Sequence, residues 1–247
     1  YGPDLTQKEV EAYYAKVINK GDATPISYGL NSRLVRGEDG QLTERVWKSG
    51  GLYGAAIDRV VGWLRKAAEV AGTPEQNKAL TLLADYYTTG DLKTFDAYNI
   101  AWVADVSSPV DVINGFIEVY GDALGYRGAF ESVVSVKDEA ASVRLTTLSA
   151  EAQWFEDHSS IMDAHKKPDV KGISARVISV VSAGGDASPS LPIGINLPNA
   201  NWIRANHGSK SVTLGNIMHA YHEASSSSGS LQEFAPSQEV IALAKNH

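Results

Sequence analysis

The sequence of 247 residues contains no cysteine. Disulfide bonds, thiolate metal ligands and cysteine nucleophiles are therefore all excluded. The absence leaves the compartment open, because a chain without cysteine is stable in both oxidising and reducing surroundings. Any catalytic chemistry must rest on carboxylates, histidines, hydroxyls or a metal that such groups hold.

Long apolar runs and basic runs are also lacking. No stretch approaches the roughly 18 apolar residues of a membrane-spanning helix, so we expect no membrane partner. The formal net charge of −7 is not offset by any cluster of Lys and Arg, which argues against a nucleic-acid partner. The 43% of hydrophobic and 21% of charged residues are typical of a folded globular chain.

Several common catalytic signatures are missing. No G-x-S-x-G surrounds the serines at 225–228, and no phosphate-binding pattern continues Gly184-Gly185. His219, His222 and Glu223 form H-x-x-H-E on a predicted helix, where two histidines could share a metal. Because H-E-x-x-H and a clear third ligand are absent, a polar helix face is the preferred interpretation.

The first part of the chain is predicted to be mostly helical. Thr6 and Glu9 form a capping-box pattern, while Thr73-Pro74 and Asp91 are typical helix starts. Apolar residues follow at helical spacing. These signals predict helices over residues 10–21, 53–71, 74–90 and 91–102, a hairpin over 32–48, and a short helix opened by Ser108-Pro109.

The second part alternates between strand and helix patterns. Residues 130–136, 175–182 and 191–197 are predicted strands. A long helix is predicted over 138–158, with Val143, Leu148, Ala152 and Phe155 facing inward. Thr213 is a predicted cap for a helix over 214–223, and a final helix is predicted over 236–245.

The stretch 114–131 combines a predicted strand with a glycine-punctuated loop. Phe116, Glu118 and Tyr120 would share one face of the strand, which places a carboxylate beside aromatic rings. On spacing alone, an exposed strand with Glu118 facing water is the more common arrangement. A glycosidase pair of Glu118 and Asp122 is a further alternative.

The segment 191–199, L-P-I-G-I-N-L-P-N, is predicted to lie at an open sheet edge, because its prolines forbid full pairing. An open edge can accept an extended peptide by strand addition. Asn196 and Asn199 could bond the peptide backbone or terminus. The alternative is that the prolines only protect the edge from aggregation.

Three stretches together resemble the dipeptidyl peptidase III family, in its bacterial branch. They are G-F-I-E-V-Y-G-D-A-L-G-Y-R-G-A-F-E at 115–131, L-P-I-G-I-N-L-P-N at 191–199 and S-V-T-L-G-N-I at 211–217. The family consists of zinc exopeptidases that release dipeptides from peptide N-termini. Its two lobes, a lower one around a five-stranded β-barrel and a helical upper one that carries zinc, enclose a cleft.

The resemblance implies an α+β fold, with a helix-rich N-terminal part and part of a small β-barrel core, from the lower lobe. We divide the chain into 1–113, mostly helical with one hairpin; 114–200, the barrel core with the peptide-binding strand; and 201–247, a helical segment leading toward the zinc lobe. Short peptides are the implied partners. We expect a cytoplasmic location and keep a periplasmic one as the alternative.

The resemblance also assigns roles to individual residues. Tyr120 would be catalytic, stabilising the oxyanion that develops on the scissile carbonyl, while Glu118 would hold the free amino group of the substrate. The substrate-binding residues implied are Glu118, Leu191, Pro192, Ile193, Gly194, Asn196 and Asn199.

One departure from the family pattern is serious. The zinc motif H-E-x-x-G-H does not occur in these 247 residues, and serines follow His222-Glu223 where its second histidine would stand. We therefore expect a fragment that ends before the metal site, binds no metal itself and is inactive alone. Zinc would belong to the parent enzyme, and the rest of that polypeptide would be a partner. The alternative is a non-enzymatic peptide-binding module that uses the same edge.

Overall fold

The computed structural model describes residues 1–170, 173–188, 190–228 and 237. Helices dominate the first part of the chain and alternate with strands in the second. The helices are α1 (Gln7–Val17), α2 (Gly54–Glu69), α3 (Pro74–Thr89), α4 (Leu92–Ala104), α5 (Glu139–Ala150), α6 (Ala152–Asp157), the 3₁₀ helix η1 (Asp163–His165), α7 (Asn201–His207) and α8 (Gly215–Ser228). The strands are β1 (Ser32–Arg36), β2 (Leu42–Val46), β3 (Val110–Phe116), β4 (Phe130–Lys137), β5 (Ile173–Gly185), β6 (Gly194–Leu197) and β7 (Ser209–Leu214).

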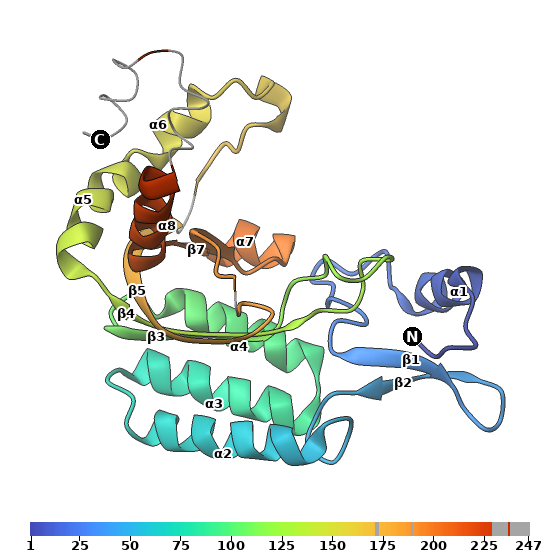
Figure 1. The fold of residues 1–247 in the computed structure, drawn as a ribbon. Coiled ribbons are helices and arrows are strands. Elements are labelled where there is room, and N and C mark those ends of the chain that lie inside the picture. The colour runs from blue at the N-terminus through green and yellow to red at the C-terminus, as the bar shows by residue number, and fades with distance from the viewer. Residues whose placement is uncertain (171–172, 189, 229–236, 238–247) are drawn as a thin grey trace.

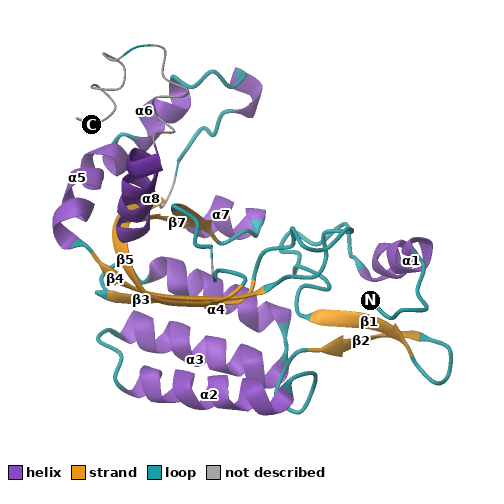
Figure 2. Ribbon diagram, viewed as in Figure 1, coloured by secondary structure: helices purple, strands orange, loops and turns teal. Residues whose placement is uncertain are grey.

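The strands form two sheets (Figure 2). The predicted hairpin is the two-stranded sheet β1–β2, and the larger sheet has the order β3-β4-β5-β7-β6. Within the larger sheet only β5 and β7 run parallel. Strands β3 and β6 are its edges and do not pair with each other in the described ranges, so this sheet is open rather than a closed barrel. The α+β class is confirmed.

A layer of helices supports the sheet. Figure 1 shows α2, α3 and α4 on one side of it and α5 and α8 on the other. Aromatic rings fill the interface between helices and sheet, with the ring centroids of Tyr86 and Phe95 4.6 Å apart. Tyr87 and Phe116 belong to the same buried cluster. The end of β3 is thus fixed against a rigid aromatic core.

The predicted helix starts are confirmed. Thr6 and Glu9 form the complete capping box of α1. The Thr73 hydroxyl accepts from the Gln76 N–H at 3.0 Å, and the Asp91 carboxylate accepts from the Thr94 N–H at 2.8 Å. Each cap satisfies a backbone donor that has no partner within its own helix.

The predicted short helix at Ser108-Pro109 is wrong. Lys137 N–H donates to the Pro109 carbonyl at 2.8 Å, so these residues lead directly into β3. Ser108 is fully buried, and its hydroxyl donates to Asp105 at 2.8 Å. That bond anchors a turn, which is a common alternative role for Ser-Pro.

The inward face predicted for residues 138–158 is also wrong. The helix is interrupted after Ala150, and Val143, Leu148 and Phe155 are 68%, 51% and 50% exposed. Instead, Ala141 and Ser142 face the sheet. The Ser142 hydroxyl donates to the Val177 carbonyl at 3.2 Å and accepts from the Val177 N–H at 3.1 Å. Small side chains permit this close approach to β5, which the apolar pattern did not indicate.

The region after residue 200 differs from the predicted helical segment. It contains strand β7, and Thr213 lies within that strand rather than capping a helix. Helix α8 starts two residues later and includes the serines at 225–228. The final helix predicted over 236–245 lies outside the described residues apart from Ser237. No helix in the described part of the chain is long and apolar enough to cross a membrane.

A buried ion pair joins β7 to β3. Lys210 is 0% exposed, and its Nζ lies 2.9 Å from Oδ2 of Asp111 and 4.3 Å from the ring centroid of Trp102. The indole Nε1–H of Trp102 donates to the other Asp111 oxygen at 2.8 Å. Burial lowers the pKa of Lys210, and the Asp111 carboxylate opposes that shift.

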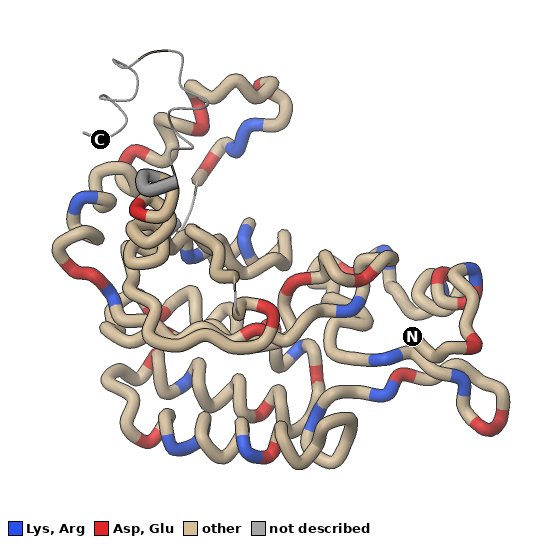
Figure 3. Tube along the Cα trace, viewed as in Figure 1, with Lys and Arg blue, Asp and Glu red and all other residues tan. Residues whose placement is uncertain are grey.

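Elsewhere, basic and acidic residues are interspersed along the chain (Figure 3).

We predict that Lys210→Met destabilises the fold by about 3–5 kcal/mol, because it leaves the Asp111 carboxylate unpaired next to a buried ring. Urea unfolding followed by tryptophan fluorescence measures the change. Adding Asp111→Asn should recover part of the loss, because the amide is neutral and still accepts from Trp102. A double variant as unstable as the single one would contradict the electrostatic explanation.

Candidate functional site: a carboxylate-lined cavity beneath an open strand edge

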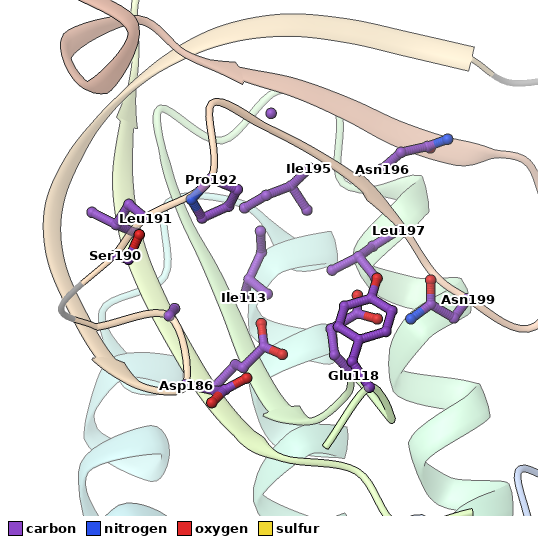
Figure 4. Close-up of a pocket in the computed structure, with 14 residues that line it drawn as sticks. Ile113, Glu118, Asp186, Ser190, Leu191, Pro192, Ile195, Asn196, Leu197 and Asn199 are labelled. Atoms are coloured by element: carbon purple, nitrogen blue, oxygen red, sulfur yellow. The ribbon is translucent and has the colours of Figure 1, made fainter. Parts of the chain in front are cut away.

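One cavity of about 500 Å³ collects most of the predicted site residues. It lies between the end of the β3–β4 hairpin and the segment that carries β6 (Figure 4). The predicted residues in its lining are Glu118, Tyr120, Leu191, Pro192, Gly194, Asn196 and Asn199. Ile193 is outside the lining and 57% exposed; its carbonyl accepts from the Leu214 N–H at 3.0 Å.

The β3–β4 hairpin places Glu118 and Tyr120 at this cavity. Strand β3 ends at Phe116, earlier than predicted, but Ala129 N–H still donates to the Glu118 carbonyl at 2.8 Å. Glu118 is therefore held by backbone pairing, while Tyr120 lies beyond it and is 85% exposed. A hydrogen bond to Glu118 raises the pKa of Tyr120 above the ordinary value of about 10, at which the phenol is already protonated at neutral pH.

The structure gives Asp122 a role other than that of the glycosidase partner of Glu118. Its Oδ2 accepts from the Tyr1 hydroxyl at 2.6 Å and from the N–H groups of Tyr126 and Arg127 at 2.8 and 2.9 Å. Burial alone would raise the pKa of Asp122, but these hydrogen bonds outweigh it and lower the pKa. Asp122 anchors the loop and is not among the residues that line the cavity.

Strand β6 supplies an open edge above the cavity. It pairs with β7 along one side only, with Ile195 opposite Val212 and Leu197 opposite Lys210. The predicted open edge is thus confirmed. Ile195 and Leu197 line the cavity on its β6 side. The other edge of β6 leaves backbone donors and acceptors available to an extended partner.

Two carboxylates in the lining were missed by the sequence analysis. Asp186 follows β5, and Figure 4 shows it below β6 on the same side of the cavity as Glu118. Glu131 lies on β4, and its Oε1 is buried without a hydrogen-bond partner in the described part of the chain. Burial, with help from Glu118 and Asp186, raises the pKa of Glu131 to about 7. The available signals were a glutamate within an apolar strand and an aspartate after Gly184-Gly185.

A second cavity of about 500 Å³ lies on the other side of three of these residues. Glu118, Tyr120 and Asn199 line both cavities. The remaining wall of the second cavity comes from Tyr126, other residues of the loop after β3, and residues within 18–30. These three residues therefore lie where the two cavities meet, and they form the partition between them.

The described residues do not fit a catalytic metal ion. Within the described ranges, no group of three or more His, Asp or Glu side chains is arranged to hold one. In the H-x-x-H-E pattern, Nε2 of His219 lies 3.4 Å from Oε1 of Glu223, and both side chains are about 70% exposed.

An open strand edge can accept an extended chain by strand addition, and the carboxylates and asparagines of the cavity beneath it can accept hydrogen bonds. This arrangement suggests a peptide-processing protein. The comparison with known protein families agrees with that class. The chain belongs to peptidase family M49, whose model matches residues 5–241.

Individual relatives agree with this family. Dipeptidyl peptidase 3 of Homo sapiens is 29% identical over 189 residues, which cover 76% of this chain and 24% of the human protein. The solved structures of DPP III from Caldithrix abyssi and of dipeptidyl-peptidase III from Corallococcus sp. strain EGB each align with a TM-score of 0.75 at 27% identity. The alignments cover 90% and 89% of this chain, and 41% and 40% of those chains. The chain thus spans about a quarter of the length of its curated relatives.

We predict that Glu131 makes stability depend on pH. Its pKa is about 7 in the fold and near 4.5 in the unfolded chain. Between these values the unfolded chain releases the proton while the fold keeps it, so the free energy of unfolding falls as pH rises from about 4.5 to 7. The expected loss is about 1–2 kcal/mol, since solvent screens this half-buried group.

Urea unfolding of wild type and Glu131→Gln at pH 4.5, 6 and 8 measures this effect. The Gln variant should become more stable than wild type as pH rises. Glu38→Gln, at an exposed turn residue, is the matched control and should follow wild type. A constant difference between wild type and Glu131→Gln across the pH range would contradict the raised pKa.

Proposed function

We propose that this chain supplies the peptide-binding part of a metal-dependent dipeptidyl peptidase. The observation that carries the proposal is the convergence of Glu118, Tyr120, Asn196 and Asn199 on one cavity beneath the open edge of β6. These residues come from two segments about 75 positions apart. The membership of peptidase family M49 supports the same conclusion.

The free edge of β6 would bind the peptide backbone. A peptide that pairs with this edge gains a ladder of backbone hydrogen bonds and becomes a sixth strand of the sheet. Such pairing is indifferent to side chains, so it suits an enzyme that accepts many sequences. Asn196 and Asn199, whose amides both donate and accept, would bond the backbone groups that the ladder leaves free.

Glu118 would fix the position of the N-terminus. A dipeptidyl peptidase must hold the free amine at a set distance from the bond that it cuts. A carboxylate holds an amine through a charge-assisted hydrogen bond, which is stronger than a neutral one. Glu118 stands in the partition between the two cavities, where it would also prevent the peptide from extending further.

Tyr120 would donate to the oxygen of the scissile carbonyl. Its hydroxyl is a neutral donor, because even the ordinary tyrosine pKa is about 10, and the hydrogen bond to Glu118 raises it further. The donated hydrogen bond strengthens as negative charge develops on that oxygen, so it favours the transition state over the bound substrate. Zinc is the metal that we propose for the parent enzyme. We expect the chain alone to bind peptides without cleaving them.

A non-enzymatic peptide-binding module is the second candidate function. The open edge of β6 and the carboxylates of the cavity would bind a peptide without a metal. Both candidates use the same edge and the same amine site. They differ in whether the parent protein releases dipeptides.

We predict that Glu118→Ala weakens binding of a peptide with a free N-terminus by roughly 10- to 150-fold, which corresponds to about 1.5–3 kcal/mol for a hydrogen bond to a charged group. The same peptide with an N-acetyl group should bind the variant and wild type equally. Calorimetric titration of this chain with both peptides measures the effect, with Glu38→Ala as the control. Equal losses for the two peptides would show that Glu118 is structural.

We predict that Tyr120→Phe lowers kcat of the complete enzyme by about 100- to 1000-fold and leaves KM nearly unchanged, because the hydrogen bond acts mainly in the transition state. Steady-state release of dipeptides measures both constants. Tyr53→Phe is the matched control, since Tyr53 is also an exposed tyrosine, at 75%, but lies outside the cavity. A variant that loses only affinity would contradict the assigned role.

A further inference from the structure

A small cavity lies beneath the segment that carries Asn199. Its volume is about 40 Å³. Helix α4 provides one wall through Phe95, Asp96 and Asn99, and residues 197–200 provide another. Asn199 thus lines both this small cavity and the cavity of about 500 Å³ beneath β6, the peptide cavity.

Two polar side chains of α4 are buried at this cavity without a protein partner. Asp96 is 7% exposed and Asn99 is 9% exposed. Neither side chain makes a hydrogen bond with any residue that the structure describes. Buried polar groups are almost always satisfied, by protein or by ordered water, because an unsatisfied group costs about 1–3 kcal/mol. A cavity of this volume with several polar walls has room for a water molecule.

We propose that Asp96 and Asn99 hold an ordered water molecule against residues 197–200, and that this water positions Asn199 at the peptide cavity. Asp96 and Asn99 are positioning residues, since they act on the peptide site through Asn199. The consequence for peptide binding rests on the proposed function. The positioning of Asn199 by the water does not depend on that function.

The protonation state of Asp96 controls the direction of these hydrogen bonds. Burial, with a smaller contribution from Asp91, raises the pKa of Asp96 to about 7, and Lys93 opposes the shift. The other residues that line the small cavity have no ionisable side chain. Below pH 7 the carboxyl group donates to the water, and above pH 7 the carboxylate only accepts. The water must then reorient, which changes what it offers to residues 197–200.

The side-chain amide of Asn199 reports on this arrangement in nuclear magnetic resonance spectra of the chain without peptide. In wild type, its ¹⁵N and ¹H resonances should shift between pH 5.5 and 8.5 with a midpoint near 7. Asp96→Asn should abolish that shift and keep the resonances close to one end of the wild-type range, since the amide still holds the water. Glu131→Gln, which removes a carboxyl group of the peptide cavity whose pKa is also about 7, should keep the shift.

A pH-dependent shift that persists in Asp96→Asn would overturn the proposal, and so would an Asn199 resonance that does not respond to pH in wild type. A crystal structure of wild type provides an independent measurement. It should contain an ordered water within hydrogen-bond distance of Asp96 and Asn99. A dry cavity would overturn the proposal.

The double variant Asp96→Leu/Asn99→Leu removes both polar partners of the water and should displace Asn199 in the crystal. If this variant does not fold, the comparison of wild type with Asp96→Asn still decides the question. Failure of every variant and of wild type to bind peptides would contradict the proposed function. It would leave the positioning of Asn199, which is measured without peptide, unaffected.

Discussion

The position of the open edge of β6 depends on the buried ion pair between Lys210 and Asp111. Strand β6 is only four residues long, and in the described part of the chain it pairs only with β7. The position of β7 therefore determines the position of β6. Lys210 fixes β7 by reaching Asp111 on β3, and Trp102 of α4 covers the pair. Charges buried in this way are costly unless paired, so the three elements have a single favourable arrangement. The ion pair therefore fixes the place of the open edge relative to β3.

The carboxylates of the cavity form a second constraint, and this one opposes stability. Glu131 keeps its proton near neutral pH because its carboxyl group is buried, and the nearby Glu118 and Asp186 carboxylates add to that effect. A fold retains such an arrangement when the site has a use for it, as with other strained or mismatched groups at functional sites. In the proposed complex, the peptide amine would supply the positive charge that these side chains lack.

Local signals predicted much of the fold, whereas half of the cavity lining was implied by the resemblance to the dipeptidyl peptidase III family. The caps at Thr6, Thr73 and Asp91 act within four residues, so sequence patterns alone identified them. The prolines around β6 indicated an edge strand for the same reason. Strand β7 was missed because Lys210 occupies a position where the alternating pattern would require an apolar residue. Its burial depends on Asp111, which is 99 positions earlier in the chain.

The errors around α5 and the cavity have a related cause. Apolar spacing marked Val143 and Leu148 as core residues, but the contact with β5 is made by the small residues Ala141 and Ser142. Glu131 and Asp186 acquire their importance only when β4 and the loop after β5 are brought beside Glu118. Neither residue carries a pattern of its own, so composition and periodicity could not single them out.

The order of the strands in space also determines when the site can exist during synthesis. Strand β6 is made before β7, yet β7 stands between it and β5, so β6 has no sheet to join until residue 214 has left the ribosome. Until then the nascent segment 191–199 carries an unpaired apolar strand. Its prolines would keep that strand from aggregating with neighbouring chains until β7 is available for pairing. The same residues that shape the cleft thus protect the chain before the cleft has formed.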